Sequence, residues 1–238
     1  MLGLRQRAVL AAVISQYIEA AQPVSSQELI EDFGFEVSPA TIRNDLAYLE
    51  AAGLLTHVYT SSGRVPTDQG YRLFISELLE PKLTPAERRL LEQIWQERSR
   101  ASLANLCDAL ARCTHAYALV VGRDGEVLSN SKLAMALAEP EFNNREFIMN
   151  FLELVDRWSR VRLAEENFWQ DDPAPRFLVG AEAAEWLAGA PDYALAVMAV
   201  RRGRNRAGIL LIGPKRLPYH KIAAALDLIS QRGLPRES

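Results

Sequence analysis

Cysteine and histidine are scarce in this sequence, which has two cysteines and three histidines among its 238 residues. Cys107 and Cys113 stand six positions apart on one helical pattern, too far along it for a disulfide. None of the histidines has a Cys, Asp or Glu beside it at metal-ligand spacing; they are His57, His115 and His220. The sequence therefore predicts two buried free thiols, no disulfide framework and no metal site.

Long apolar runs and catalytic signatures are missing as well. No run of 18 apolar residues occurs, and the first seven residues (MLGLRQR) lack the long apolar core of a signal peptide. The sequence contains no glycine-rich phosphate loop, no nucleophile elbow and no zinc signature. We therefore expect a cytoplasmic protein that is not an enzyme and that has no catalytic residues and no cofactor.

Positive charge is scarce over residues 1–80, where five arginines stand against ten carboxylates and leave a formal charge of −5. Domains that bind DNA are usually basic, because neutralising phosphates supplies most of their non-specific affinity. This composition excludes a broad basic surface. If this region binds DNA, we expect weak non-specific binding, a shallow salt dependence and a few well-placed contacts.

Residues 38–53 (SPATIRNDLAYLEAAG) predict a helix with a marked start, a marked end and a polar outer face. Ser38 is a natural N-cap, Pro39 fits the first helical position, and Gly53 suits the left-handed residue that closes a helix. At a period of 3.6, the apolar stripe consists of Ile42, Leu46 and Leu49. The other side carries Ala40, Thr41, Asn44, Ala47 and Tyr48, with Arg43 at its border. Such hydrogen-bonding groups suit base edges and phosphates, which is typical of a DNA recognition helix.

The flanking segments complete a winged helix-turn-helix. Residues 4–20 and 25–33 predict two helices, the second opened by a capping box from Ser25 and Glu28 and closed at Gly34. Residues 54–66 predict a hairpin, the wing, and Thr67 caps a further helix. The wing tip offers hydroxyls, a glycine and an arginine that suit a phosphate backbone. The candidate DNA-binding residues are Ser38, Thr41, Arg43, Asn44, Tyr48, Ser61, Ser62, Gly63 and Arg64.

The second half predicts a separate α+β domain. Two prolines bracket a short link at residues 80–85, so we expect domains at 1–80 and 81–238, and the 49% hydrophobic content is enough for two cores. Helices are predicted at 84–98, 102–114, 141–160 and 219–231. Strands are predicted at 116–121, 177–180, 193–200 and 207–212. Helices mixed with short, hairpin-linked strands indicate the α+β class.

Several segments resemble the HrcA family of heat-shock repressors. They are residues 23–26 (PVSS), 38–46 (SPATIRNDL), 49–55 (LEAAGLL), 60–72 (TSSGRVPTDQGYR) and 208–222 (GILLIGPKRLPYHKI). The segment 60–72 is the most specific of these, because repressors of the DeoR type share the TIRxDL core. Members of the family are usually longer, with an extra segment inserted in the C-terminal domain, so we interpret this chain as a shortened member.

This resemblance implies a fold, an operator and partners. The C-terminal domain would be a GAF-like sensor and dimerisation domain. The protein would act as a homodimer on double-stranded DNA, at the inverted-repeat CIRCE operator before chaperonin and Hsp70 operons. Chaperonin would support the active repressor, so that unfolded proteins, by occupying chaperonin, release the operon. No membrane takes part.

Two other functions remain open at this point. The first is a metabolite-responsive, DeoR-like repressor whose C-terminal domain binds a small ligand. The second is an enzyme with a winged-helix regulatory module, which the missing acid, base and metal clusters disfavour. Residues 201–206 (RRGRNR) are either a solvated hairpin turn or an auxiliary contact to DNA phosphates or an acidic partner.

Overall fold

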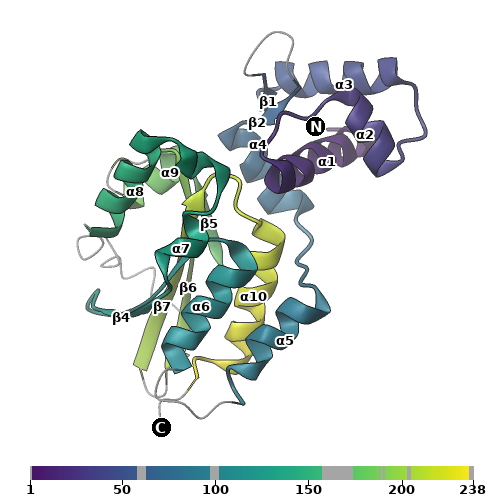
Figure 1. Cartoon of the computed structure of the whole chain (residues 1–238). Helices are drawn as coiled ribbons and strands as arrows, with labels where there is room; N and C mark the ends of the chain where they lie inside the picture. The colour runs from purple at the N-terminus through teal and green to yellow at the C-terminus, as the bar shows by residue number, and fades with distance from the viewer. Residues whose placement is uncertain are drawn as a thin grey trace. The chain divides into compact units, whose positions relative to one another are not determined.

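The computed structural model describes residues 2–57, 63–96, 102–156, 174–187, 189, 191–202 and 205–235 (Figure 1). Contacts between Cα atoms divide the chain into two compact units, Met1–Glu80 and Pro81–Ser238. Below they are called the N-terminal and the C-terminal unit. Each unit encloses its own buried apolar residues.

The N-terminal unit begins with three helices, α1 (Leu4–Ala20), α2 (Ser26–Phe33) and α3 (Pro39–Ala51). The predicted capping box forms, because Ser25 accepts from the backbone N–H of Glu28 while the Glu28 carboxylate accepts from that of Ser25. Gly34 then ends α2 in the left-handed conformation, at φ 62°. The helix-turn-helix predicted from the sequence is therefore confirmed.

A short hairpin and one more helical segment follow α3. Strand β1 (Leu55–Thr56) pairs antiparallel with β2 (Val65–Pro66). Helix α4 (Asp68–Leu73) starts at the predicted cap, Thr67, and continues as a π-helical turn, η1 (Phe74–Leu78). Gly70 is needed here because a Cβ on it would stand 2.1 Å from the carbonyl oxygen of Leu54. This close approach packs α4 against Leu54, where the wing begins.

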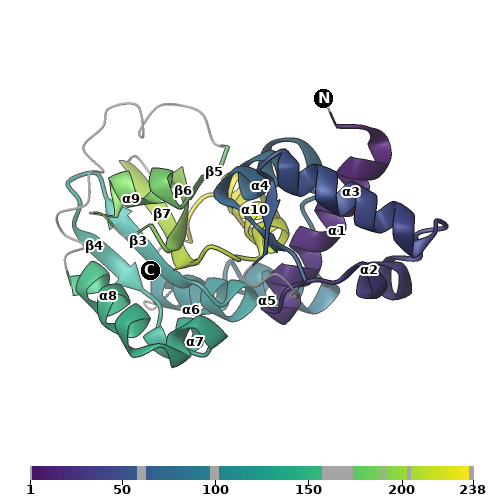
Figure 2. The same cartoon turned by 90° about the horizontal axis from the view of Figure 1, so that it is seen from above.

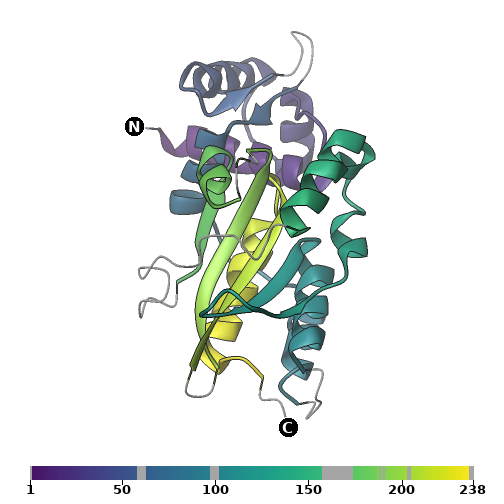
Figure 3. The same cartoon turned by 90° about the vertical axis from the view of Figure 1, so that its left-hand side faces the viewer.

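The C-terminal unit is built on one antiparallel sheet of five strands in the order β4-β3-β7-β6-β5 (Figure 3). Their bounds are β3 (Tyr117–Gly122), β4 (Val127–Asn130), β5 (Arg176–Val179), β6 (Tyr193–Arg202) and β7 (Asn205–Pro214). The two long strands β6 and β7 form the predicted hairpin, and every residue of β3 is buried. A central strand buried on both faces requires a layer of helices on each side.

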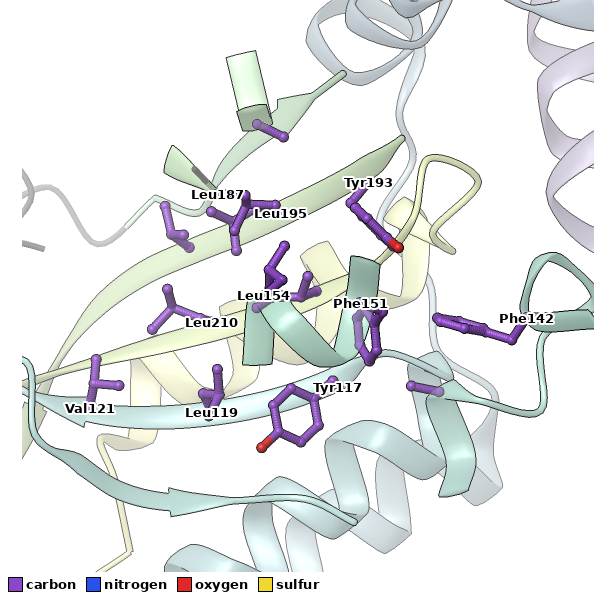
Figure 4. Packing of buried hydrophobic residues seen from close by; sticks show 14 residues of the cluster. Tyr117, Leu119, Val121, Phe142, Phe151, Leu154, Leu187, Tyr193, Leu195 and Leu210 are labelled. Atoms are coloured by element: carbon purple, nitrogen blue, oxygen red, sulfur yellow. The ribbon is translucent and has the colours of Figure 1, made fainter. Parts of the chain in front are cut away.

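Helices cover both faces of this sheet (Figure 2). The helical segments are α5 (Pro85–Gln93), α6 (Ser102–Thr114), α7 (Leu133–Ala136), η2 (Pro140–Asn143), α8 (Arg145–Asp156), α9 (Ala181–Trp186) and α10 (Tyr219–Arg232). Helix α6 packs on β3 and β4, and α10 packs on β6 and on α6. Figure 4 shows the other face, where α8 lays Phe151 and Leu154 over residues that include Tyr117, Tyr193 and Leu210.

Two predicted helices are wrong at their ends. The segment predicted as one helix over 141–160 starts as the 3₁₀ turn η2, and α8 begins only at Arg145. The reason is Asn144, whose side-chain oxygen accepts from the backbone N–H groups of Glu146 and Phe147 and so caps a new helix. Helix α5 ends at Gln93, five residues before the predicted end. Residues 157–160, with Trp158, lie outside the described part.

Candidate nucleic-acid interface

Helix α3 exposes one polar face and buries the other. Ile42 and Leu49 are fully buried and Leu46 is 5% exposed. Arg43, Asn44 and Tyr48 are exposed, with Tyr48 at 47%. Thr41 is half-buried. Asn44 and Tyr48 stand one turn apart on the same side of the helix, and Arg43 lies at the border of that side. Their contact with DNA stays a prediction.

The beginning of α3 is fixed by its own cap. The Ser38 hydroxyl lies 3.2 Å from the backbone nitrogen of Thr41 and 2.9 Å from the Thr41 hydroxyl. Ser38 therefore satisfies an amide that the helix itself leaves open. Ser38 and Thr41 were predicted to contact DNA, and in this structure both hydroxyls already take part in the cap.

The wing is tied to the rest of the unit at its base. Ser61 and Ser62 lie outside the described residues. Gly63 has an internal reason to be glycine, because a Cβ there would stand 2.6 Å from the backbone of Val24. Arg64 exchanges two backbone hydrogen bonds with Val24, of 2.9 and 2.8 Å. The sequence suggested that Gly63 allows a close approach to the DNA backbone. In the structure, the chain that approaches Gly63 closely is the protein's own backbone at Val24, before α2.

Glu50 joins the end of α3 to both arms of the wing. One of its carboxylate oxygens lies 2.9 Å from the Nε of Arg64, and the other lies 2.6 Å from the Nδ1 of His57. All three side chains are partly exposed, so the attraction is screened by solvent. The effect is geometric: the ion pair with Glu50 holds the Arg64 guanidinium beside the end of α3.

Most arginines of this acidic unit are already engaged. Arg5 pairs with Asp45, Arg7 pairs with Glu77, and Arg64 pairs with Glu50. Arg72 has an interaction of its own. The side chain of Arg43 makes no hydrogen bond or ion pair with any residue that the structure describes, and the same holds for Asn44. The Arg43 guanidinium and the Asn44 amide therefore have hydrogen-bonding groups that no described residue uses.

Sequence reasoning missed that Asp45 is buried and paired. This carboxylate is 4% exposed, inside the apolar contact between α3 and α1. Its position carried the signal: Asp45 follows Ile42 by three residues and precedes Leu49 by four, which places an acid on the apolar stripe of the helix. The prediction counted Asp45 only as one of ten negative charges.

Polar groups of the C-terminal unit pair with one another. Arg216, 7% exposed, is held by the carboxylates of Glu139 and Glu141, and His115 lies 2.6 Å from Glu139. Among the described residues no group of three or more His, Cys, Asp or Glu could hold a metal ion. An open groove of about 490 Å³ lies between α5 and α6; its lining is Ala86, Glu87, Arg89, Leu90, Gln93, Arg112 and Cys113.

Both cysteines are buried free thiols, as predicted. Burial raises the pKa of Cys107 to about 12 and that of Cys113 to about 11, so neither is a thiolate at neutral pH. Residues 201–206 stand at the end of the β6–β7 hairpin, where Arg201 is exposed, and Gly203 and Arg204 lie outside the described residues. None of the described helices is both long and apolar enough to cross a membrane.

Known proteins resemble this chain in two ways. The DeoR-like helix-turn-helix domain matches residues 11–64. A crystal structure of a hypothetical protein superposes on 98% of this chain and 97% of its own, with a TM-score of 0.65 and 20% sequence identity. That identity supports a shared fold alone, an N-terminal helix-turn-helix followed by an α+β unit. The five-stranded antiparallel sheet fits the GAF-like domain that the resemblance implied.

Curated relatives share sequence with about half of this chain. The heat-inducible transcription repressor HrcA of Chloroflexus aggregans is 39% identical over 135 residues, which are 55% of this chain and 36% of that protein. The same repressor of Beutenbergia cavernae is 46% identical over 122 residues, 49% of this chain and 34% of its own. The repressor of Herpetosiphon aurantiacus is 52% identical over 100 residues, which are 41% of this chain and 28% of that protein. By this similarity the chain is a relative of the HrcA heat-inducible transcription repressors, matched over about half of its own length and about a third of theirs.

Proposed function

We propose that this protein is a heat-inducible transcription repressor that reads an inverted-repeat operator with helix α3. The observation that carries the proposal is the pair Arg43 and Asn44: both are exposed, and neither side chain is engaged within the described part of the protein. They stand on the second helix of a helix-turn-helix, the helix that enters the major groove in this motif. The relatives named above are repressors by name.

Each residue has a role that its chemistry suits. Asn44 can donate to and accept from adenine at once, and Arg43 can reach guanine or a phosphate. Tyr48 and Thr41 lie along the same helix and would fix its register on the duplex. Ser61, Ser62, Gly63 and Arg64 of the wing would contact the adjacent backbone. A bidentate contact of this type discriminates between base pairs by about 1–3 kcal/mol.

The proposal includes the assembly and the signal. An inverted repeat has two equal halves, so it calls for two copies of this chain. Release on heating follows the names of the relatives, and chaperonin remains the partner that the resemblance implies. The similarity to heat-inducible repressors favours this function over a metabolite-responsive one, and no catalytic role is proposed.

Selection of duplexes from a random-sequence library by the full chain tests this function without assuming the operator. We expect enrichment of an inverted repeat, a footprint over both halves, and sedimentation of the complex with two chains per duplex. Warming should release the DNA, and added chaperonin should oppose that release. Failure to enrich any sequence over the starting library, with protein shown to be folded, would contradict the proposal.

A further inference from the structure

The geometry points to Asp45, together with Arg5, as the positioning pair of the recognition helix: their ion pair sets the rotation of α3 on α1, and so the direction in which Arg43 and Asn44 point. This inference rests on the proposed function, because a recognition helix is what gives the rotation a consequence. Asp45 itself is buried and touches no DNA in this account.

Burial makes the partner of Asp45 essential. A carboxylate taken out of water is destabilising unless it is paired and hydrogen-bonded. Asp45 is 4% exposed and lies among Ile42, Leu46 and Leu49. An alanine or leucine would fill this position of the stripe without that cost. We therefore infer that the charge of Asp45 has a role that an apolar side chain could not fill.

Arg5 supplies the partner in a two-pronged geometry. Its Nε donates to one oxygen of Asp45 at 2.6 Å, and a terminal nitrogen donates to the other at 3.3 Å. Hydrogen bonding and charge attraction from Asp45 raise the pKa of Arg5. Two bonds between two planar groups restrict direction as well as distance. The pair joins the first turn of α1 to the middle of α3, residues 40 positions apart in sequence.

The apolar contact sets the rotation of α3 on α1 less sharply than a directional bond does. Apolar burial has no preferred direction, so a small roll of α3 on α1 would leave Ile42, Leu46 and Leu49 covered. The ion pair resists such a roll. With side-chain tips about 6 Å from the helix axis, a roll of about 10° moves them by about 1 Å. That is enough to lose a base hydrogen bond, whose donor–acceptor distances span only about 2.7–3.2 Å.

The test compares four variants on the duplex that the wild-type chain selects and on a scrambled duplex. Arg5→Gln and Asp45→Asn remove one charge each. Arg5→Lys keeps the charge but cannot donate to both carboxylate oxygens in the same planar geometry. Arg7→Gln is the matched control, because Arg7 is on the same helix and its partner, Glu77, is not on α3. We expect Arg5→Gln and Asp45→Asn to lower the ratio of the two affinities by about tenfold, the range of one lost base contact. The affinity ratio of Arg5→Lys should lie between those of the wild type and Arg5→Gln. Arg7→Gln should leave the ratio unchanged.

The salt dependence separates positioning from a direct contact. If Arg5 neutralised a phosphate, Arg5→Gln would reduce the salt slope by about 1, and Asp45→Asn, which frees Arg5, would strengthen binding. Positioning predicts an unchanged slope in both variants together with loss of discrimination. An unchanged affinity ratio in Arg5→Gln and Asp45→Asn, or the direct-contact pattern, would overturn the inference.

Amide hydrogen exchange of the free protein decides the same question without DNA. We expect Arg5→Gln and Asp45→Asn to speed exchange along α3 while α2 keeps its protection, and Arg7→Gln to change neither. If the wild-type chain selected no duplex, the proposed function would fail while this measurement still judged the pair. Unchanged protection of α3 in both variants would contradict positioning even if binding to DNA were shown.

Discussion

Helix α3 of the N-terminal unit and the interior of the C-terminal unit use polar side chains in opposite ways. In the N-terminal unit, Arg43 and Asn44 stand exposed on one helix with their side chains unengaged in the described part. In the C-terminal unit, Arg216 is enclosed by two carboxylates, and the Tyr193 hydroxyl donates to a backbone oxygen at 2.6 Å. Groups with unused hydrogen-bonding capacity are available to a partner, while groups already satisfied hold a fold together. The proposal that α3 recognises DNA rests on this difference.

The core of the C-terminal unit shows most clearly how side chains hold a fold together. Phe151 of α8 packs against three other rings, at centroid distances of 4.9 Å to Phe142, 5.6 Å to Tyr193 and 6.2 Å to Tyr117 (Figure 4). Burial raises the pKa of Tyr193. These rings join the sheet to the helices on one of its faces, so they stabilise this unit.

Truncating that ring should have the largest effect and should separate the units. Phe151→Ala should destabilise the C-terminal unit by about 3–5 kcal/mol, because a fully buried aromatic side chain leaves a cavity. Hydrogen exchange resolved by peptide measures this unit apart from residues 1–80, whose protection should not change. Met149→Ala on the same helix is the control: Met149 is 50% exposed, and its loss should cost about 0.5 kcal/mol or less. Equal losses for both variants would contradict the packing described.

A change in the N-terminal unit should act on the wing. In Gly70→Ala the new Cβ would meet the Leu54 carbonyl oxygen, so α4 must move away from the wing base. We expect a loss of about 1–3 kcal/mol in the stability of this unit, as for other overpacked sites. Thermal unfolding measures it, with Gln69→Ala, at an exposed position of the same helix, as the control. A Gly70→Ala protein as stable as the control would show that the wing is not fastened this way.

Acid should weaken the C-terminal unit by a smaller amount. Burial tends to raise the pKa of Glu87, but hydrogen bonds from Lys221 and Thr84 outweigh it, and the pKa lies below the ordinary 4.5. The folded form therefore binds this proton less readily than the unfolded one. Its contribution is present above pH 4.5 and is lost as the pH falls through the lowered value.

The size of that effect is about 1 kcal/mol or less, as for a partly exposed ion pair. Denaturant unfolding followed at pH 6 and at successively lower pH measures it. Glu87→Gln should be less stable than wild type at pH 6 and should show a flatter acid limb. An acid limb identical in the two proteins would mean that Glu87 makes no net contribution. Glu92→Gln, on the same helix, provides the comparison.

The same contrast explains how much the sequence could predict. The N-terminal helices follow from local signals, since Ser25, Gly34, Ser38 and Thr67 cap them at the predicted places. The C-terminal unit depends on pairing between distant segments. Strand β4, with two partly exposed residues and two exposed ones, carries little apolar signal and exists because β3 pairs with it.

The exposed residues of the candidate site could be predicted from the sequence, but the ion pairs that hold α3 and the wing in place could not. Arg43, Asn44 and Tyr48 are exposed because the helix period leaves them off the apolar stripe. The engagement of Arg64 by Glu50, and of Asp45 by Arg5, requires the wing and α1 to be folded against α3. No local pattern contains that information, apart from the unexplained acid on the apolar stripe.

The most direct test of the central claim is the affinity of Asn44→Ala for the selected duplex and for a scrambled one. Arg123→Ala serves as the control, an exposed residue of the C-terminal unit. We predict that Asn44→Ala loses about tenfold or more in affinity for the selected duplex and little for the scrambled one, while Arg123→Ala changes neither. Equal losses of Asn44→Ala on both duplexes would contradict the claim that α3 reads sequence.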